Sequence, residues 1–274
     1  MRTLVAFVIL VTPNLAHSYP LVLDLVPSYH WYHGCSPTAS ANIIGYWDLH
    51  GYDGLFTASG WKEVRYTDNV QDEISSPEHN AKYDARPDSP DLPHPPNTSI
   101  ADFMGTGQGS LGYGATYVSN IDNGIENYAA YQGYSFDAQY MGSTWENFIN
   151  EIDLGNPVVL NVDSSGNGRI DHSMTGIGYD DRGADGLWYA SYNTWHESET
   201  INWYQFRRTS SDYGFGLYSM AYVHPLDSPI GGMDISYMDF NQLQGPVPAP
   251  EPATVLLFGT GLVGLIGSRL RKKK

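Results

Sequence analysis

Short β-type segments separated by turn residues fill much of the second half of the chain, and this pattern restricts the fold more than any other feature. Four runs rich in Val, Ile and Tyr cover residues 158–162, 173–179, 187–192 and 218–223. Gly, Asp and Asn lie between them, as is typical of tight turns. The pattern therefore predicts an antiparallel sheet in this half.

The first half of the chain predicts helices instead. Ser36 and Pro37 are typical of a helix start, apolar residues follow at positions 39, 43, 46 and 47, and Gly51 marks the end. A second helix is predicted within residues 117–131. Residues 68–97 are rich in Asp, Pro, Ser, His and Asn, which predicts a long surface loop.

A third helix stands before the β-type segments. Ser143 and Glu146 form a capping-box pair, apolar residues at positions 148, 149 and 152 form one stripe, and Gly155 ends the helix. A helical half followed by an antiparallel half is the order of an α+β fold.

The globular middle of the chain is strongly acidic. The 274 residues carry a formal net charge of −16, and residues 19–250 hold 8 basic against 29 acidic side chains. Such a body repels phosphate backbones and anionic lipid headgroups, so nucleic acid is not among the expected partners. The length between the terminal segments fits one domain, which we place at residues 19–240.

Both ends of the chain carry targeting signals. Residues 1–18 combine a positive charge at Arg2, an apolar run and the small-x-small sequence that ends in Ser18, which predicts a signal peptide cleaved after Ser18. At the other end, a linker at 241–249 leads to Pro250-Glu251-Pro252, an apolar Gly-rich run and a basic tail. An apolar run followed by a basic stop is typical of a transmembrane helix.

Residues 250–274 resemble the PEP-CTERM sorting signal of Gram-negative bacteria, because motif, apolar helix and basic end occur in the same order. The resemblance implies recognition and cleavage near the triplet by an exosortase-type enzyme. We therefore expect an exported protein of the cell envelope, cell surface or extracellular space, held in the membrane by its C-terminal helix before processing. An ordinary tail anchor is the alternative, and it also places the body outside the cytoplasm.

Cys35 is the one cysteine of the chain, so it cannot form an internal disulfide. It stands just before the helix that Ser36 and Pro37 predict, where the helix dipole and unpaired N–H groups stabilise a thiolate. Gly34, Ser36 and Thr38 are small and leave room for a substrate carbonyl. The pattern indicates a nucleophile; a buried cysteine that acts as a small hydrophobic side chain is the alternative.

A nucleophilic cysteine needs a base within hydrogen-bond reach and a third group that orients the base. Paired positions of an antiparallel hairpin share a constant index sum, and a turn centred at Gly183 gives a sum near 366. His172 and Asn193 sum to 365, so we expect them nearly opposite each other, with the side-chain amide oxygen of Asn193 accepting from the imidazole. The predicted catalytic residues are Cys35, His172 and Asn193.

The segments around these residues resemble the C39-like peptidases, which are papain-fold relatives of the enzymes that process bacteriocin leaders. Residues 31–39 with Gly45-Tyr46-Trp47-Asp48 look like the nucleophile segment, residues 171–179 like the histidine strand, and residues 188–195 like the third-residue strand. The resemblance covers about residues 27–223. It implies a papain-like cysteine peptidase fold, with the cysteine in the helical half and the histidine and Asn193 in the antiparallel half.

The family's oxyanion-hole Gln, expected a few residues before the nucleophile, is missing, because the first Gln of the chain is Gln71. His30 stands at the right distance and is the candidate oxyanion donor. Loss of one such donor typically costs about 100- to 1000-fold in rate. The resemblance implies hydrolysis of a peptide or similar amide through a thioester, with a peptide or protein as substrate.

Two other functions stay open at this point. One is a peptidase fold that binds at the cell surface or in the extracellular matrix without cutting, since fold does not fix function; the other is acyl transfer from the same thioester to an amine.

Neither a cofactor nor a metal is expected. The segment from Asp163 to Asp171 follows the first nine positions of a calcium loop, but Met174 stands where a bidentate Glu is required, so we interpret it as a turn that delivers His172.

Overall fold

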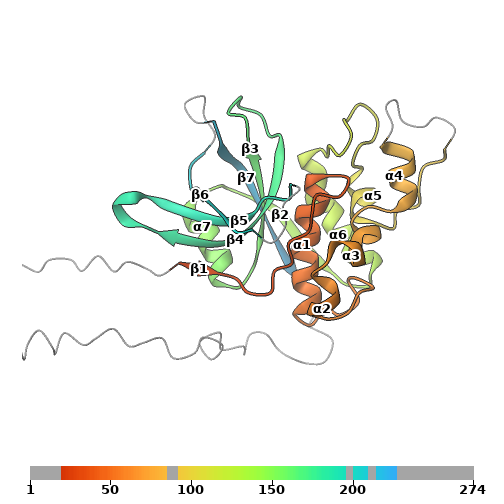
Figure 1. The fold of residues 1–274 in the computed structure, drawn as a ribbon, viewed down its shortest axis with the longest axis horizontal. Helices are drawn as coiled ribbons and strands as arrows, with labels where there is room; N and C mark the ends of the chain where they lie inside the picture. The colour runs from red at the N-terminus through yellow and green to blue at the C-terminus, as the bar shows by residue number, and fades with distance from the viewer. Residues whose placement is uncertain (1–19, 85–91, 196–199, 209–213, 227–274) are drawn as a thin grey trace, which may run out of the picture. The chain divides into compact units, whose positions relative to one another are not determined.

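The computed structural model describes residues 20–84, 92–195, 200–208 and 214–226. Within this part, helices built from residues 35–131 form one half, and an antiparallel sheet with one further α-helix forms the other (Figure 1). The predicted signal peptide, linker and C-terminal helix lie outside the described residues. No helix of the described part is long and apolar enough to cross a membrane.

The helical half is arranged around α1 (Cys35–Leu49), in which every residue from Ser36 to Asp48 is buried. A helix buried on all sides lies inside its half rather than on its surface. The others are α2 (Trp61–Val64), α3 (Thr67–Ile74), α4 (Pro77–Tyr83), α5 (Ile100–Met104), η1 (Val118–Asn120) and α6 (Ile121–Tyr131). The predicted helices near 36 and within 117–131 are confirmed, but the first begins at Cys35 and has Gly34 as its N-cap.

The long loop predicted for residues 68–97 is wrong, because α3 and α4 occupy most of its first half. α3 buries Val70 and Ile74. α4 has Ser76 as its N-cap, whose hydroxyl accepts from the backbone N–H of His79 at 3.1 Å, and Pro77 at its first position. Both helices are short and mostly polar, and such helices depend on tertiary packing that local composition does not reveal.

The sheet has the strand order β2-β7-β3-β4-β5-β6, with β1 also paired to β4, and all of its pairs are antiparallel. The four predicted strands are confirmed as β3 (Val158–Asp163), β4 (His172–Asp181), β5 (Leu187–Tyr192) and β7 (Gly216–Pro225). Three further strands were not predicted: β1 (Leu21–Val22), β2 (Phe136–Met141) and β6 (Asn202–Gln205). The fold is α+β, as the order of helices and strands predicts.

The two faces of β4 have different partners, because side chains alternate along a strand. On one face, Ser173 Oγ lies 2.9 Å from Ser36 Oγ, and Asn42 Nδ2 donates to Thr175 Oγ1 at 2.9 Å, so α1 packs here. On the other face, Met174 joins the core under α7 (Trp145–Asp153) with Phe148, Ile152, Leu160, Tyr189, Leu217 and Met220. The start of β4 thus lies against the start of α1.

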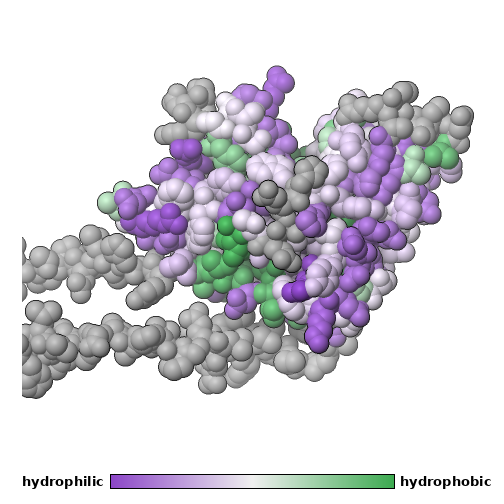
Figure 2. Space-filling model, in the orientation of Figure 1, coloured by the Kyte–Doolittle hydropathy of each residue, from purple (hydrophilic) through white to green (hydrophobic). Residues whose placement is uncertain are grey.

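The surface agrees with the acidic, polar composition. Figure 2 shows hydrophilic residues over much of the visible face of both halves. The apolar residues of the chain are instead concentrated in the interior, around α1 and between α7 and the sheet. The net charge predicts that the protein does not bind nucleic acid, and this stays a prediction.

Candidate active site

A tight backbone turn places Cys35 at the first position of α1. His33 has φ 51° and Gly34 has φ 155°, values that side chains of L-residues rarely allow. A Cβ added at Gly34 would lie 3.0–3.1 Å from Pro37, Thr106 and Gly114. Only glycine fits at this position, so the turn that presents the cysteine depends on it.

Thr38 fixes the same turn from inside the helix. Its hydroxyl donates to the backbone oxygen of Gly34 at 2.6 Å and accepts from the backbone N–H of Tyr32 at 3.1 Å. Because Thr38 is fully buried in α1, these two bonds hold the approach to Cys35 rigidly against the helix. Rigid placement matters here because a nucleophile must be held close to its productive geometry.

His172 is the first residue of β4 and is only 6% exposed. Its imidazole lies beside the thiol of Cys35, close enough to lower the pKa of that thiol. The structure therefore brings together two side chains that stand 137 positions apart in the sequence, one from the start of a helix and one from the start of a strand. A cysteine with a histidine ring beside it has the arrangement that thiol chemistry requires.

The surroundings of Cys35 favour its thiolate. Burial raises the pKa of the thiol, but the hydrogen bond to His172, the positive charge of that ring, the backbone N–H of Ser173 and the hydroxyl of Ser36 together outweigh it. The pKa of Cys35 is therefore lower than that of an ordinary cysteine. A larger share of the sulfur is ionised near neutral pH than in a free thiol.

The second ring nitrogen of His172 contacts the main chain. Nε2 lies 2.5 Å from the backbone oxygen of Asn193, and the hydroxyl of Thr194 is 3.4 Å from the same nitrogen. A carbonyl oxygen can only accept, so Nε2 carries the proton in the neutral ring. Nδ1 is then left to accept the thiol proton of Cys35.

The predicted contact of the Asn193 side chain with the imidazole is corrected by the structure. The Asn193 amide points elsewhere: Nδ2 donates to the hydroxyl of Tyr204 at 2.8 Å, and Oδ1 accepts from Ser191 at 3.5 Å. Asn193 still contacts His172, but through its backbone carbonyl.

The cause of this difference is the register of the hairpin. The turn contains the 3-10 helix η2 (Gly183–Asp185), and the last pairs before it are Asp180↔Trp188 and Asp181↔Leu187, which centre the turn at position 184 rather than 183. At the open end the ladder finishes with Thr175↔Tyr192, an index sum of 367. Continued to position 172, this register gives position 195 as the neighbour, so Trp195 rather than Asn193 lies alongside His172.

Trp195 covers the imidazole, which the sequence did not predict. The two rings are stacked, with centroids 4.5 Å apart and an interplanar angle of 19°. The backbone oxygen of Trp195 accepts from the backbone N–H of Trp31 at 2.8 Å, which ties this segment to the approach to Cys35. The stack covers one face of the ring and restricts its orientation.

Cys35 and His172 open into a cleft of about 370 Å³. Its walls include three aromatic residues, Trp31, Tyr113 and Trp195, and one carboxylate, Asp171. The loop that carries Tyr113 joins α5 to η1, so the cleft lies where residues of the helical half meet the start of β4. A cleft of this size with a reactive thiol at its wall can admit part of an extended peptide.

His30, the predicted oxyanion donor, lies outside this cleft. Its side chain is exposed, its backbone N–H donates to Thr67 Oγ1 at 2.9 Å, and it is not among the residues that line the cleft. The preceding residue, Tyr29, is completely buried, so the chain turns His30 outward. The structure instead places Cys35 and Ser36, the first residues of α1, on the cleft wall.

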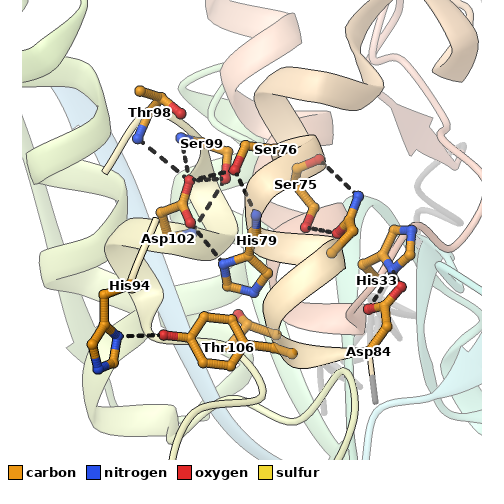
Figure 3. Close-up of polar contacts among 12 residues, drawn as sticks. His33, Ser75, Ser76, His79, Asp84, His94, Thr98, Ser99, Asp102 and Thr106 are labelled. Carbon is orange, nitrogen blue, oxygen red and sulfur yellow. Dashed lines mark hydrogen bonds and ion pairs between the residues drawn. The ribbon is translucent and has the colours of Figure 1, made fainter. Parts of the chain in front are cut away.

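A second polar cluster, in the helical half, contains serine, histidine and aspartate but does not have the geometry of a catalytic triad (Figure 3). Asp102 Oδ1 lies 2.7 Å from Nδ1 of the buried His79, and Asp102 Oδ2 accepts from Ser76 Oγ at 3.0 Å and from Ser99 Oγ at 2.6 Å. The Ser76 hydroxyl thus donates to the carboxylate rather than to the imidazole. The cluster caps α4 and α5 and ties them together.

The segment that resembles the start of a calcium loop is a turn in which the Asp163 carboxylate is hydrogen-bonded to the backbone of the turn itself. Asp163 accepts from the backbone N–H groups of Ser165, Asn167 and Gly168 at 2.6–3.2 Å. Among the described residues no group of three or more His, Cys, Asp or Glu is arranged to hold a metal ion. The turn leads directly to Asp171 and His172.

Comparison with known protein families agrees with this architecture. Residues 22–213 match the Peptidase_C39 like family, and residues 248–272 match the PEP-CTERM protein-sorting motif. A search of curated proteins found no match. The sorting motif indicates export to the cell envelope or surface and implies recognition by an exosortase-type enzyme. Because the first match covers most of the chain and agrees with the α+β fold, this exported, peptidase-like protein belongs to the Peptidase_C39 like family.

Proposed function

We propose that this chain is an exported cysteine peptidase that hydrolyses peptide bonds through a thioester on Cys35. The observation that carries the proposal is the position of the His172 imidazole beside the Cys35 thiol on one cleft, with Nε2 of the ring bonded to the backbone oxygen of Asn193. The lowered pKa of Cys35 supports it, since the thiolate is the attacking species.

The reaction follows from the placement of these groups. Nδ1 of His172 takes the thiol proton while Sγ of Cys35 bonds to the carbonyl carbon, and the carbonyl oxygen becomes an oxyanion. The first N–H groups of α1 have no acceptor within the helix, so they are the proposed oxyanion donors. The imidazolium then protonates the leaving amine as the C–N bond breaks, which leaves a thioester.

Water completes the cycle. Nδ1 of His172 takes a proton from a water molecule, whose oxygen attacks the thioester carbonyl, and the C–S bond breaks to release the carboxylic acid and the Cys35 sulfur. In this scheme Asn193 is a positioning residue that acts through its main chain, and Trp195 keeps the ring in place. His30 has no part in it, because it lies outside the cleft.

Hydrolysis is tested with a peptide mixture and two forms of the exported chain. We expect the wild type to cut peptides and to show a transient acyl mass increase after acid quenching. Cys35→Ser should cut at least about 1000-fold more slowly, because the nucleophile of such a group carries most of the rate enhancement.

Cleavage that persists in Cys35→Ser would refute the thioester mechanism. Products that contain an added amine instead of a new carboxylate would assign acyl transfer. A wild type that binds peptides without cutting any would leave the binding alternative.

We further propose that residues 250–274 hold the protein transiently in the membrane until the sorting enzyme cuts near Pro250-Glu251-Pro252. The match to the sorting motif and the basic tail from Arg269 support this order of events. Protein released from cells should have an intact mass that lacks the basic tail. Replacement of Glu251 with alanine should raise the share that stays in the membrane fraction with the tail attached; an unchanged distribution would contradict the proposal.

A further inference from the structure

We propose that the cleft at Cys35 recognises a basic side chain, lysine or arginine, next to the scissile bond. Its binding groups are the aromatic rings of Tyr113 and Trp195 and the carboxylate of Asp171. This inference names a substrate class for the peptidase and so rests on the proposed function, although binding itself requires only an intact cleft.

The aromatic walls are open to a ligand. Tyr113 is 42% exposed and Trp195 is 39% exposed, and both line the cleft. Trp31 supports Tyr113 from the side, with ring centroids 5.5 Å apart at an angle of 75°. Cations within about 6 Å of an aromatic face are attracted by the ring, and the attraction grows when the site is partly desolvated.

Tyr113 is held in place from behind by a histidine and a carboxylate. Its hydroxyl lies 3.1 Å from Nδ1 of His33, and the same nitrogen is 2.8 Å from Asp84 at the end of α4. Figure 3 shows His33 and Asp84 side by side at this point. A tyrosine fixed in this way loses little conformational entropy when a ligand binds, which favours recognition.

Apart from the Cys35–His172 pair, the charge of the cleft is negative. Asp171 is exposed, lines the cleft and holds its Oδ1 in a hydrogen bond from the backbone N–H of Ser164 at 2.7 Å. Of the described residues that line the cleft, none is Lys or Arg, and Asp171 is the only carboxylate. Aromatic faces combined with a fixed carboxylate suit a positively charged side chain and disfavour a negative one.

The test uses short peptides of alanine and glycine that carry one lysine, one norleucine or one glutamate at each position in turn. We expect the wild type to cut the best lysine peptide at least about tenfold faster than the matched glutamate peptide. Asp171→Asn keeps the oxygen that accepts from Ser164 and removes only the charge, so the lysine-to-norleucine rate ratio should fall about three- to fivefold. Tyr113→Leu should lower the same ratio about two- to fivefold.

Asp72→Asn is the matched control, because it removes one exposed carboxylate that does not line the cleft. An equal fall of the ratio in this variant would assign the preference to overall charge and overturn the inference, as would equal cleavage of the three peptides.

Peptide binding to Cys35→Ser, measured by calorimetry, separates this inference from the proposed function. Tighter binding of the lysine peptide without cleavage by the wild type would support the inference and refute hydrolysis. Cleavage with no preference for lysine would support hydrolysis and refute the inference.

Discussion

Replacement of His172 with alanine is expected to slow the alkylation of Cys35 at pH 6 by about tenfold or more. The imidazole lowers the pKa of the thiol, whereas burial raises it, so without the ring the pKa should lie above the ordinary value near 8.5. At pH 6 well under about 1% of such a thiol is ionised. The labelling rate of the wild type should therefore fall off at a lower pH than that of His172→Ala.

The measurement is the rate of iodoacetamide labelling across pH, followed by intact mass. The chain has one cysteine, so each added label reports Cys35 alone. Asn193→Ala is the matched control: its contact with His172 is made by the backbone, which alanine retains, so its pH profile should resemble that of the wild type. A His172→Ala profile that overlays the wild type would mean that Cys35 is an ordinary thiol. A strong effect in Asn193→Ala would mean that its side chain supports the ring after all.

The parts of the fold that the sequence predicted are those with strong local patterns. The strands β3, β4, β5 and β7 are runs of apolar and aromatic residues bounded by turns, and α1 has Ser36 and Pro37 in its first turn. The helices α3 and α4 were missed, because they are short and polar and depend on contacts such as the buried pair of His79 and Asp102. Contacts between residues far apart in sequence leave no periodic pattern to recognise.

The sequence likewise predicted only part of the candidate active site. The sequence indicated that the start of α1 and the start of β4 carry the thiol and the imidazole, and the structure places these groups in contact. The neighbour of the ring was misjudged because the index sum at the open end of the hairpin is 367, after an irregularity between Gly176 and Gly178, whereas His172 and Asn193 sum to 365. Tyr113 reaches the cleft from a loop whose sequence carries no catalytic pattern, so only the tertiary structure identifies it.

The second large effect is expected from Asp102→Ala, which should lower the free energy of unfolding by about 3–5 kcal/mol. Oδ1 of Asp102 is hydrogen-bonded to the ring of buried His79. Oδ2 accepts from the hydroxyls of Ser76 and Ser99 and from the backbone N–H groups of Ser99 and Thr98. Alanine leaves these donors without their acceptor, and those of Ser76, His79 and Ser99 are buried. Urea unfolding followed by tryptophan fluorescence measures the loss, and the exposed Asp72→Ala, expected to stay within about 0.5 kcal/mol of the wild type, is its control.

The pH dependence of this loss has a definite sign. Burial raises the pKa of Asp102, but the bonds from His79, Ser99 and Ser76 outweigh it, so the pKa in the folded protein is lowered. A carboxyl with a lowered folded pKa stabilises the fold fully above its unfolded pKa of about 3.9, and this contribution is lost as the pH falls through the folded value. The difference between wild type and Asp102→Ala should therefore be full at pH 7 and shrink below about pH 4. A difference that is independent of pH would assign the loss to packing alone, and an unchanged stability at pH 7 would show that the carboxylate does not hold α4 and α5 together.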